Sequence, residues 1–403
     1  LALIGVAQVG AISTWFSAAA VATSLAAEWR LSASEVASLT AAVQLGFVVG
    51  ALVLAISGLA DVWSSRRIFT CSAILAAGLN AAVTLVPGPG AFWQALVLRA
   101  LLGFCLAGVY PVGMKLMTGW FREHRGLAIG TVVGALTLGS ALPHAVAGLG
   151  LGQALAWRSV FLFTSMVTLT SAAIIGLTVS SGPYEARGAT IDLRWAVRSL
   201  GDPALRLANF GYFGHMWELY AMWTWLPAFL AASFGAWAQA NGEPIDGRQS
   251  SLAAALAIGI GALGCVGAGL AADRVGRTVT TSAAMLVSGT CALVAGLLFG
   301  QAPWLVMLVT TVWGISVIAD SAQFSASISE LAPPERVGSA LAIQTSVGFL
   351  LTVISIQLLP FFQSMIGWSG AFAILAIGPA LGVVAMLRLR MRPEAIKMAG
   401  GRR

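Results

Sequence analysis

The sequence predicts an all-helical membrane protein in which twelve transmembrane helices form two pseudo-symmetric six-helix bundles. Three observations lead to this fold class. Hydrophobic residues make up 58% of the 403 residues and charged residues only 9%, whereas a soluble domain carries about 25% charged residues. The apolar residues stand in long continuous runs, not in the short alternating segments of a transmembrane barrel. Landmark residues of the first half also recur in the second half at a nearly constant distance.

The composition excludes a cytoplasmic enzyme, a secreted disulfide scaffold and a disordered chain, because so few charges cannot cover a water-exposed surface. Four cysteines lie inside apolar runs without any Cys-x-x-Cys pair, and we interpret them as small core residues. The sequence holds no Ser/His/Asp constellation, no His-Glu-x-x-His motif and no Walker A phosphate loop. We therefore expect no enzyme activity, no ATP-driven pumping, no cofactor and no metal site.

A helix that crosses the bilayer needs about 20 apolar residues. Runs of this kind predict spans over residues 3–26, 32–57, 67–87, 91–117, 126–150, 156–180, 205–233, 250–271, 279–300, 303–329, 335–361 and 367–389. The longest polar segment follows the sixth span. It divides the chain into an N-terminal bundle, a cytoplasmic linker, a C-terminal bundle and a cytoplasmic tail, over residues 1–180, 181–204, 205–389 and 390–403.

The basic residues predict the orientation. If both termini lie in the cytoplasm, the loops and tail on that side hold most of the 22 Lys and Arg residues, whereas the outer loops hold only Arg30, Arg158 and Arg248. Such an excess on the cytoplasmic side is typical of multi-pass membrane proteins. The net charge of +7 is therefore interpreted as a topology signal, and we expect no nucleic-acid partner.

An internal repeat supports the division into two bundles. Three landmarks of the first bundle recur 211 or 212 residues later: Asp61 as Asp273, Arg125 as Arg336, and Trp157 as Trp368. Two homologous six-helix halves predict a transporter whose binding site lies between them.

The segment 269–277, Gly-Leu-Ala-Ala-Asp-Arg-Val-Gly-Arg, resembles the loop after spans two and eight of the major facilitator superfamily. The first copy is degenerate but keeps Asp61 and two arginines. In the fourth span, Arg99 and Gly103 resemble the Arg-x-x-x-Gly pattern of proton-coupled members. Residues 120–126 look like a loop of the bacterial organic-anion and cyanate/nitrate-type branches. The resemblance implies a bacterial-type inner membrane protein, a monomer in the lipid bilayer, with gating residues Asp61, Asp273, Arg274 and Arg277.

Two acids, Glu218 and Asp320, lie well inside predicted spans. A charge in hydrocarbon is costly, so each needs a reason. The resemblance implies that spans seven and ten line the central cavity. His215 lies three residues before Glu218 and shares its helix face, so Glu218, assisted by His215 and Asp320, is our expected proton carrier. The alternatives are a hydrogen-bonded pair that only packs span seven and a salt bridge of Asp320.

Five further side chains lie on predicted cavity helices at suitable depths and are candidates for substrate binding: Arg99, Tyr110, Trp15, Trp223 and Gln323. Arg99 can hold an anionic substrate or oppose an acid of the other half. Its alternative role is structural, as a donor of hydrogen bonds to nearby carbonyl groups.

The sequence therefore predicts a secondary transporter that moves a small solute, a small anion or organic acid, by alternating access and proton coupling. Its partners are the solute, protons and the lipid bilayer. One alternative is an exporter of drugs or lipophilic cations. A second is a copper transporter that uses Met114, Met117, Met216 and Met222. Outside transport, the alternative is a transporter-like sensor that binds ligand without moving it.

Overall fold

The structure is a computed structural model that describes residues 1–121, 125–150, 157–184, 192–244 and 246–403. Helices make up most of these ranges, and no strand occurs in them. Nine segments within the same ranges are long and apolar enough to cross a membrane, and the last of them, Pro334–Arg390, contains two helices. The predicted all-helical membrane fold is confirmed.

The first half of the chain contains the helices α1 (Ala2–Ile12), α2 (Ser17–Ala20), α3 (Ala22–Trp29), α4 (Ala33–Ser57), α5 (Leu59–Val62), α6 (Ser65–Ala82), α7 (Phe92–Leu106), α8 (Tyr110–Trp120), α9 (Arg125–Leu149) and α10 (Trp157–Thr178). Short 3-10 turns η1 (Val83–Leu85) and η2 (Pro89–Ala91) join α6 to α7. A few helices begin with a side-chain cap. Ser32, for example, accepts the backbone N–H of Glu35, whose carboxylate accepts the N–H of Ser32.

After α11 (Leu193–Ser199), the second half contains α12 (Pro203–Asn241), α13 (Gly247–Gly259), α14 (Gly261–Val275), α15 (Arg277–Leu297), α16 (Pro303–Ala319), α17 (Ser321–Leu331), α18 (Val337–Ala371) and α19 (Ile377–Arg390). The 3-10 segments are η4 (Pro334–Arg336), η5 (Phe372–Ile374) and η6 (Pro393–Gly401). Asp202 caps α12 by accepting the N–H groups of Ala204 and Leu205. Gly367, with φ of +69°, interrupts α18.

Several predicted spans are not continuous α-helices. The first breaks between α1 and α2, the fourth between α7 and α8, the eighth at Ile260, the tenth at Asp320, and the twelfth between α18 and α19. Over residues 3–26 the chain forms the short helices α1, α2 and α3 in place of one long helix. Non-helical backbone at membrane depth is tolerated only where protein buries it, and the buried Ser13, Thr14 and Ser17 satisfy this condition.

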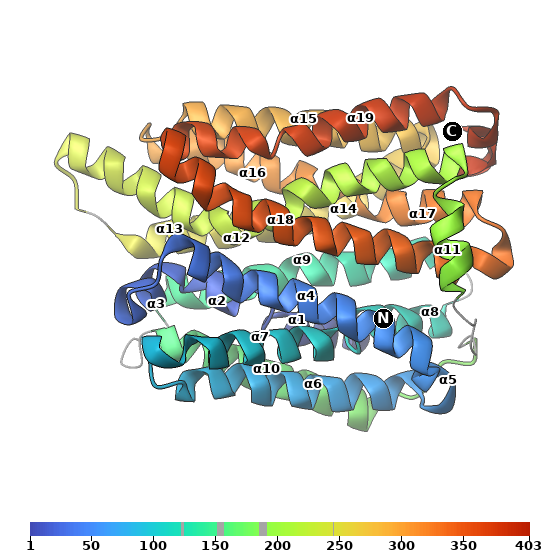
Figure 1. Cartoon of the computed structure of the whole chain (residues 1–403), viewed down its shortest axis with the longest axis horizontal. Coiled ribbons are helices and arrows are strands. Elements are labelled where there is room, and N and C mark those ends of the chain that lie inside the picture. The colour runs from blue at the N-terminus through green and yellow to red at the C-terminus, as the bar shows by residue number, and fades with distance from the viewer. Residues whose placement is uncertain (122–124, 151–156, 185–191, 245) are drawn as a thin grey trace.

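The helices form two groups that lie side by side (Figure 1). The group α1–α10 occupies the lower part of the view and α12–α19 the upper part. Helix α4 packs against α18, and α9 packs against α13 and α14. We name the end that carries α11 and η6 the tail end, and the end that carries α3 and the start of α13 the far end. At the far end Gln357 donates to Ser38 across the two groups at 2.8 Å.

The helix α11 is tied to the second group at the tail end. Asp192 forms an ion pair with Arg336 at 2.7 Å, and its backbone N–H donates to Ser339 at 2.9 Å. The backbone N–H of Trp195 and, to a smaller extent, the guanidinium of Arg336 hold the pKa of Asp192 below its ordinary value. This contact fixes one end of α11 to the start of α18.

Candidate functional site

His215 and Asp320 form a buried pair where α12 meets the break between α16 and α17. Nδ1 of His215 lies 2.8 Å from Oδ1 of Asp320, and the two side chains are 1% and 2% exposed. The imidazole packs against Tyr212 and Phe324, with ring centroids 6.0 and 5.6 Å away. Its Nε2 atom has no hydrogen-bond partner among the described residues. An imidazole and a carboxylate in contact can hold one proton between them and release it when water reaches them.

The helix break explains why Asp320 can reach α12. Its carbonyl oxygen accepts the N–H of Gln323 at 2.9 Å and of Phe324 at 3.3 Å, so the chain makes a tight turn before α17 continues. The carboxylate lies at the N-terminus of α17, where the helix dipole stabilises a negative charge.

Glu218 lies one turn from His215 on α12 but contacts different helices. Its Oε2 accepts the hydroxyl of Ser288 on α15 at 2.8 Å, and its Oε1 accepts the indole N–H of Trp313 on α16 at 2.7 Å. The side chain is 1% exposed. Both carboxylate oxygens are therefore engaged inside the second group of helices. His215 and Glu218 are neighbours along α12, as expected from their spacing. The direct side-chain contact, however, joins His215 to Asp320.

Arg99 is fully buried inside the first group, where it binds the broken first span. Nη1 donates to the carbonyl of Thr14 at 3.0 Å, to the hydroxyl of Ser17 at 3.0 Å and to Oδ1 of Asn80 at 3.2 Å. Nη2 donates to the carbonyl of Trp15 at 2.6 Å, and Nε to that of Leu39 at 3.3 Å. The carbonyls of Thr14 and Trp15 lie in the break between α1 and α2, so Arg99 gives donors to backbone groups outside a regular helix. The geometry matches the structural alternative for Arg99, hydrogen bonding to nearby carbonyls.

Trp15 and Trp223 belong to one group of six rings, which we name the aromatic cluster: Trp15, Phe16 and Phe47 from the first half, and Tyr220, Trp223 and Phe349 from the second. Phe47 and Phe349 lie 4.5 Å apart between centroids, and Trp15 lies 5.8 Å from Tyr220. Phe16 stacks on Tyr220 at 6.0 Å. The cluster closes the space between the two groups of helices.

Helix α12 arranges three features along its axis. Ala228 and Ala231 line an open pocket of about 510 Å³ at the far end, to which residues of both helix groups contribute. Tyr220 and Trp223 follow in the aromatic cluster, and His215 lies beyond them toward the tail end. At a rise of 1.5 Å per residue, successive features are separated by roughly 7 Å.

Tyr110 and Gln323 lie nearer the tail end than the cluster. Tyr110 is the first residue of α8 and packs against the hydrophobic core that both halves share. Gln323, in the first turn of α17, accepts a hydrogen bond from Arg277 at 2.7 Å. The structure thus brings Trp15 and Trp223 together and places Arg99, Tyr110 and Gln323 in three other environments.

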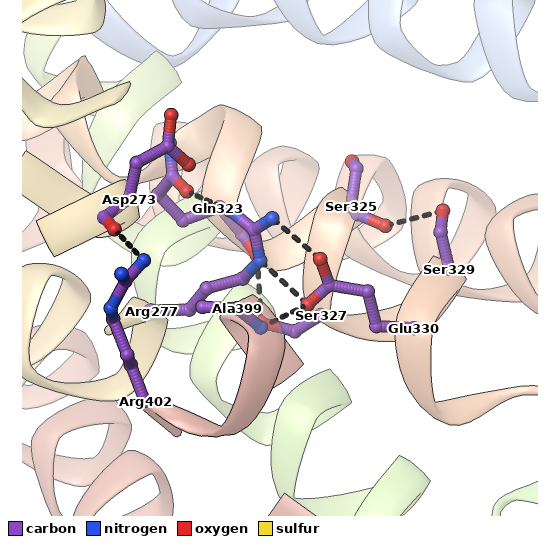
Figure 2. A network of polar contacts seen from close by, with 9 residues as sticks. All are labelled: Asp273, Arg277, Gln323, Ser325, Ser327, Ser329, Glu330, Ala399 and Arg402. Carbon is purple, nitrogen blue, oxygen red and sulfur yellow. Dashed lines mark hydrogen bonds and ion pairs between the residues drawn. The ribbon is translucent and has the colours of Figure 1, made fainter. Parts of the chain in front are cut away.

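The expected gating loop of the second half is part of a polar network at the tail end (Figure 2). Arg277 binds Glu330 with two hydrogen bonds, at 2.7 and 2.5 Å, and its third donor group binds Gln323. The backbone N–H of Ala399 donates to Glu330 at 3.1 Å. Arg402 binds the backbone carbonyl of Asp273, not its carboxylate.

Arg274, another expected gating residue, is exposed at the end of α14. The side chain of Asp61 lies outside the described residues. Sequence reasoning missed Glu330 and η6, although an acid at the end of span ten was a usable signal. The sequence composition does not predict where the residues after α19 lie in the structure.

Comparisons with known proteins agree with this architecture. The family profile described as Major Facilitator Superfamily matches residues 3–205 and 208–401. The uncharacterized transporter YgaY of Escherichia coli O157:H7 is 30% identical over 172 residues, which are 41% of each protein. Among solved structures, the nucleoside transporter NupG superposes with a TM-score of 0.73 at 13% identity, covering 96% of this chain and 98% of NupG. The xylose transporter XylE from E. coli gives 0.72 at 15%, covering 97% and 95%.

The two profile matches extend over nearly the whole sequence, and each falls on one group of helices. The solved structures agree in fold over the same length, consistent with twelve helices. The chain therefore belongs to the Major Facilitator Superfamily and is a multi-pass membrane transporter, not an enzyme.

Proposed function

We propose that the protein is a proton-coupled secondary transporter that moves a small organic acid across a bacterial inner membrane by alternating access. The single observation that carries the coupling is the buried contact between His215 and Asp320 at the break before α17. The pair lies beside the closed pathway, so rocking of the two halves can admit water to it from one side at a time. Protonation then changes the charge of the pathway, which makes solute movement depend on the proton gradient.

In this proposal Glu218 has a secondary role. Its two oxygens face Ser288 and Trp313 within one helix group, so proton exchange there requires those bonds to open. Arg99 stabilises the first span instead of contacting solute. Because the Arg99 guanidinium is occupied by backbone carbonyls, the co-transported proton compensates the negative charge of the acid.

Uptake into proteoliposomes under an imposed proton gradient tests the proposal. The probes are radiolabelled succinate, quinate and para-hydroxybenzoate, with protein-free liposomes as the blank. We expect gradient-driven accumulation of at least one probe. Asp320→Asn and His215→Gln should abolish that accumulation while leaving exchange of internal for external solute, which needs no net proton movement.

Glu243→Gln is the matched control, because Glu243 is an exposed acid at the far end. It should behave as the wild type. If Asp320→Asn accumulates solute normally under the gradient, the coupling assignment is wrong.

A second candidate function is export of lipophilic cations, and the aromatic cluster favours it because ring faces attract cations. If the proton gradient drives movement of tetraphenylphosphonium and of none of the acids, the substrate is a lipophilic cation and the proposed organic acid is wrong. Binding of a probe without any flux would instead indicate a transporter-like sensor.

A further inference from the structure

Two indole N–H groups of the aromatic cluster have no acceptor. Trp15 and Trp223 are 0% exposed, and their Nε1 atoms have no hydrogen-bond partner among the described residues. A buried donor without a partner destabilises the state that contains it. The two therefore need an acceptor that this closed state does not provide.

Other tryptophans donate their indole N–H to an acceptor within the protein. Trp157 donates to Glu28 at 2.7 Å and Trp313 to Glu218 at 2.7 Å, while Trp217 and Trp225 donate to the carbonyls of Ile374 and Ile356. The chain thus supplies acceptors to indoles that have a purely structural position. Among the described residues, Trp29 is a buried tryptophan outside the cluster whose indole N–H also has no acceptor. It lies in a separate core at the far end of the first group.

A third buried group without a partner lies on α4, the helix that carries Phe47. Gln44 is 0% exposed, and neither its amide nitrogen nor its amide oxygen has a partner among the described residues. It lies three residues before Phe47, and this spacing places it on nearly the same face of the helix. The unpaired groups thus come from both halves, with Trp15 and Gln44 from the first and Trp223 from the second.

The ring faces define what fits between these donors. The contacts Phe16–Tyr220, Phe47–Phe349 and Trp15–Phe349 all cross from one half to the other. When the halves part, these faces separate and leave a slot walled by rings. A flat ring replaces the lost ring contacts by stacking, whereas a small aliphatic acid does not. Arg99 directs its donors to backbone carbonyls and adds no cation to the slot.

We propose that the aromatic cluster is the solute site and that it takes a ring-bearing organic acid. The ring stacks between faces of the two halves, and the oxygen atoms accept hydrogen bonds from Nε1 of Trp15, Nε1 of Trp223 and the amide of Gln44. This inference rests on the proposed transport function, because it names the class of solute.

Equilibrium dialysis of radiolabelled benzoate against purified protein in detergent tests the inference, with succinate and tetraphenylphosphonium as competitors. Trp15→Phe and Trp223→Phe remove one N–H each and keep an aromatic ring. We expect each to weaken benzoate binding about tenfold, as for loss of one hydrogen bond to a charged group. Trp29→Phe removes an equally buried and unpaired N–H outside the cluster and should leave the affinity unchanged.

Unfolding midpoints of all three variants show whether they fold. If a Trp→Phe variant does not fold, Gln44→Leu measures the same loss from α4. Succinate competing as well as benzoate, unchanged affinity in folded cluster variants, or binding of the cation alone would each overturn the inference. Dialysis needs no proton gradient, so benzoate binding can persist even if coupled uptake fails. Conversely, proton-driven uptake of succinate without benzoate binding would overturn only the solute class.

Discussion

The indole N–H of Trp313 donates to Oε1 of Glu218 at 2.7 Å, so a tryptophan on α16 turns this intramembrane carboxylate toward the interior of its own helix group. Ser288 holds the second oxygen from α15. Three spans of the second half therefore meet at one carboxylate. Arg99, Asn80 and Ser17 make a comparable polar junction between α7, α6 and α2 of the first half.

Replacing Glu218 by Ala should destabilise the protein strongly. The change leaves the N–H of Trp313 unpaired in a buried site and the hydroxyl of Ser288 with only its longer bond to the carbonyl of Met285 at 3.2 Å, and we expect a loss of about 2–4 kcal/mol. The isosteric Glu218→Gln keeps most of the bonds and should unfold near the wild-type temperature while retaining proton-driven uptake. Thermal unfolding in detergent and proteoliposome uptake measure the two effects. Loss of coupling in a stable Glu218→Gln protein would return Glu218 to the role of main carrier.

Arg99→Ala should reduce stability more than any effect on solute affinity. Removal of the guanidinium leaves the carbonyl of Trp15 without its donor and takes one donor each from the carbonyls of Thr14 and Leu39, and we expect a cost of about 2–4 kcal/mol. Arg206→Ala, which removes an exposed arginine, is the control and should change stability by less than about 0.5 kcal/mol. Denaturant titration compares the two. A stable Arg99→Ala protein that has lost only its affinity for acids would contradict the structural role.

Gly46→Ala should disturb the crossing of α4 and α7. A Cβ atom at position 46 would run into the backbone of Ala100, so the helices must move apart. We expect a loss of about 1–3 kcal/mol, as for other overpacked cores. Gly78 has nothing within 4 Å of its would-be Cβ, and Gly78→Ala should be neutral or slightly stabilising because alanine favours helix. Equal unfolding midpoints for the two variants would argue against this close crossing.

The tie between Asp192 and Arg336 should depend on pH. The Trp195 N–H and Arg336 lower the pKa of Asp192 in the folded protein, so the stabilisation is complete above the unfolded value of about 3.9. It is lost as the pH falls through the lowered pKa. The unfolding midpoint of Asp192→Asn should therefore lie below that of the wild type at neutral pH, and the difference should vanish in strong acid. A difference that stays constant with pH would exclude the charge of Asp192 as its cause.

The spans were predictable because a run of about 20 apolar residues in a chain with so few charges has hardly any alternative to a helix across the bilayer. The breaks were not. Ile260 lies in an apolar run of alanines and glycines, and Asp320 was interpreted as an acid in a salt bridge. Neither position was therefore predicted to be the end of a helix. Their causes are tertiary, since the freed backbone groups find partners only after folding.

The candidate site was predictable in part for the same reason. His215, Glu218 and Asp320 stood out because charge is scarce in hydrocarbon. Spacing placed His215 and Glu218 on one face, yet α12 is surrounded by helices, and small rotations direct the two side chains to different neighbours. Phe47 and Phe349 gave no signal, because an aromatic residue in an apolar span is ordinary until its partner across the pathway is known.

The aromatic cluster also bears on speed. With no solute bound, the two halves can separate only by exposing ring faces such as those of Phe47 and Phe349 without anything to replace them. An empty carrier should therefore change orientation slowly, and a loaded one faster. Exchange of internal for external solute would then be faster than net uptake. Because the empty carrier rarely opens, it would also leak few ions, and the membrane potential would be conserved.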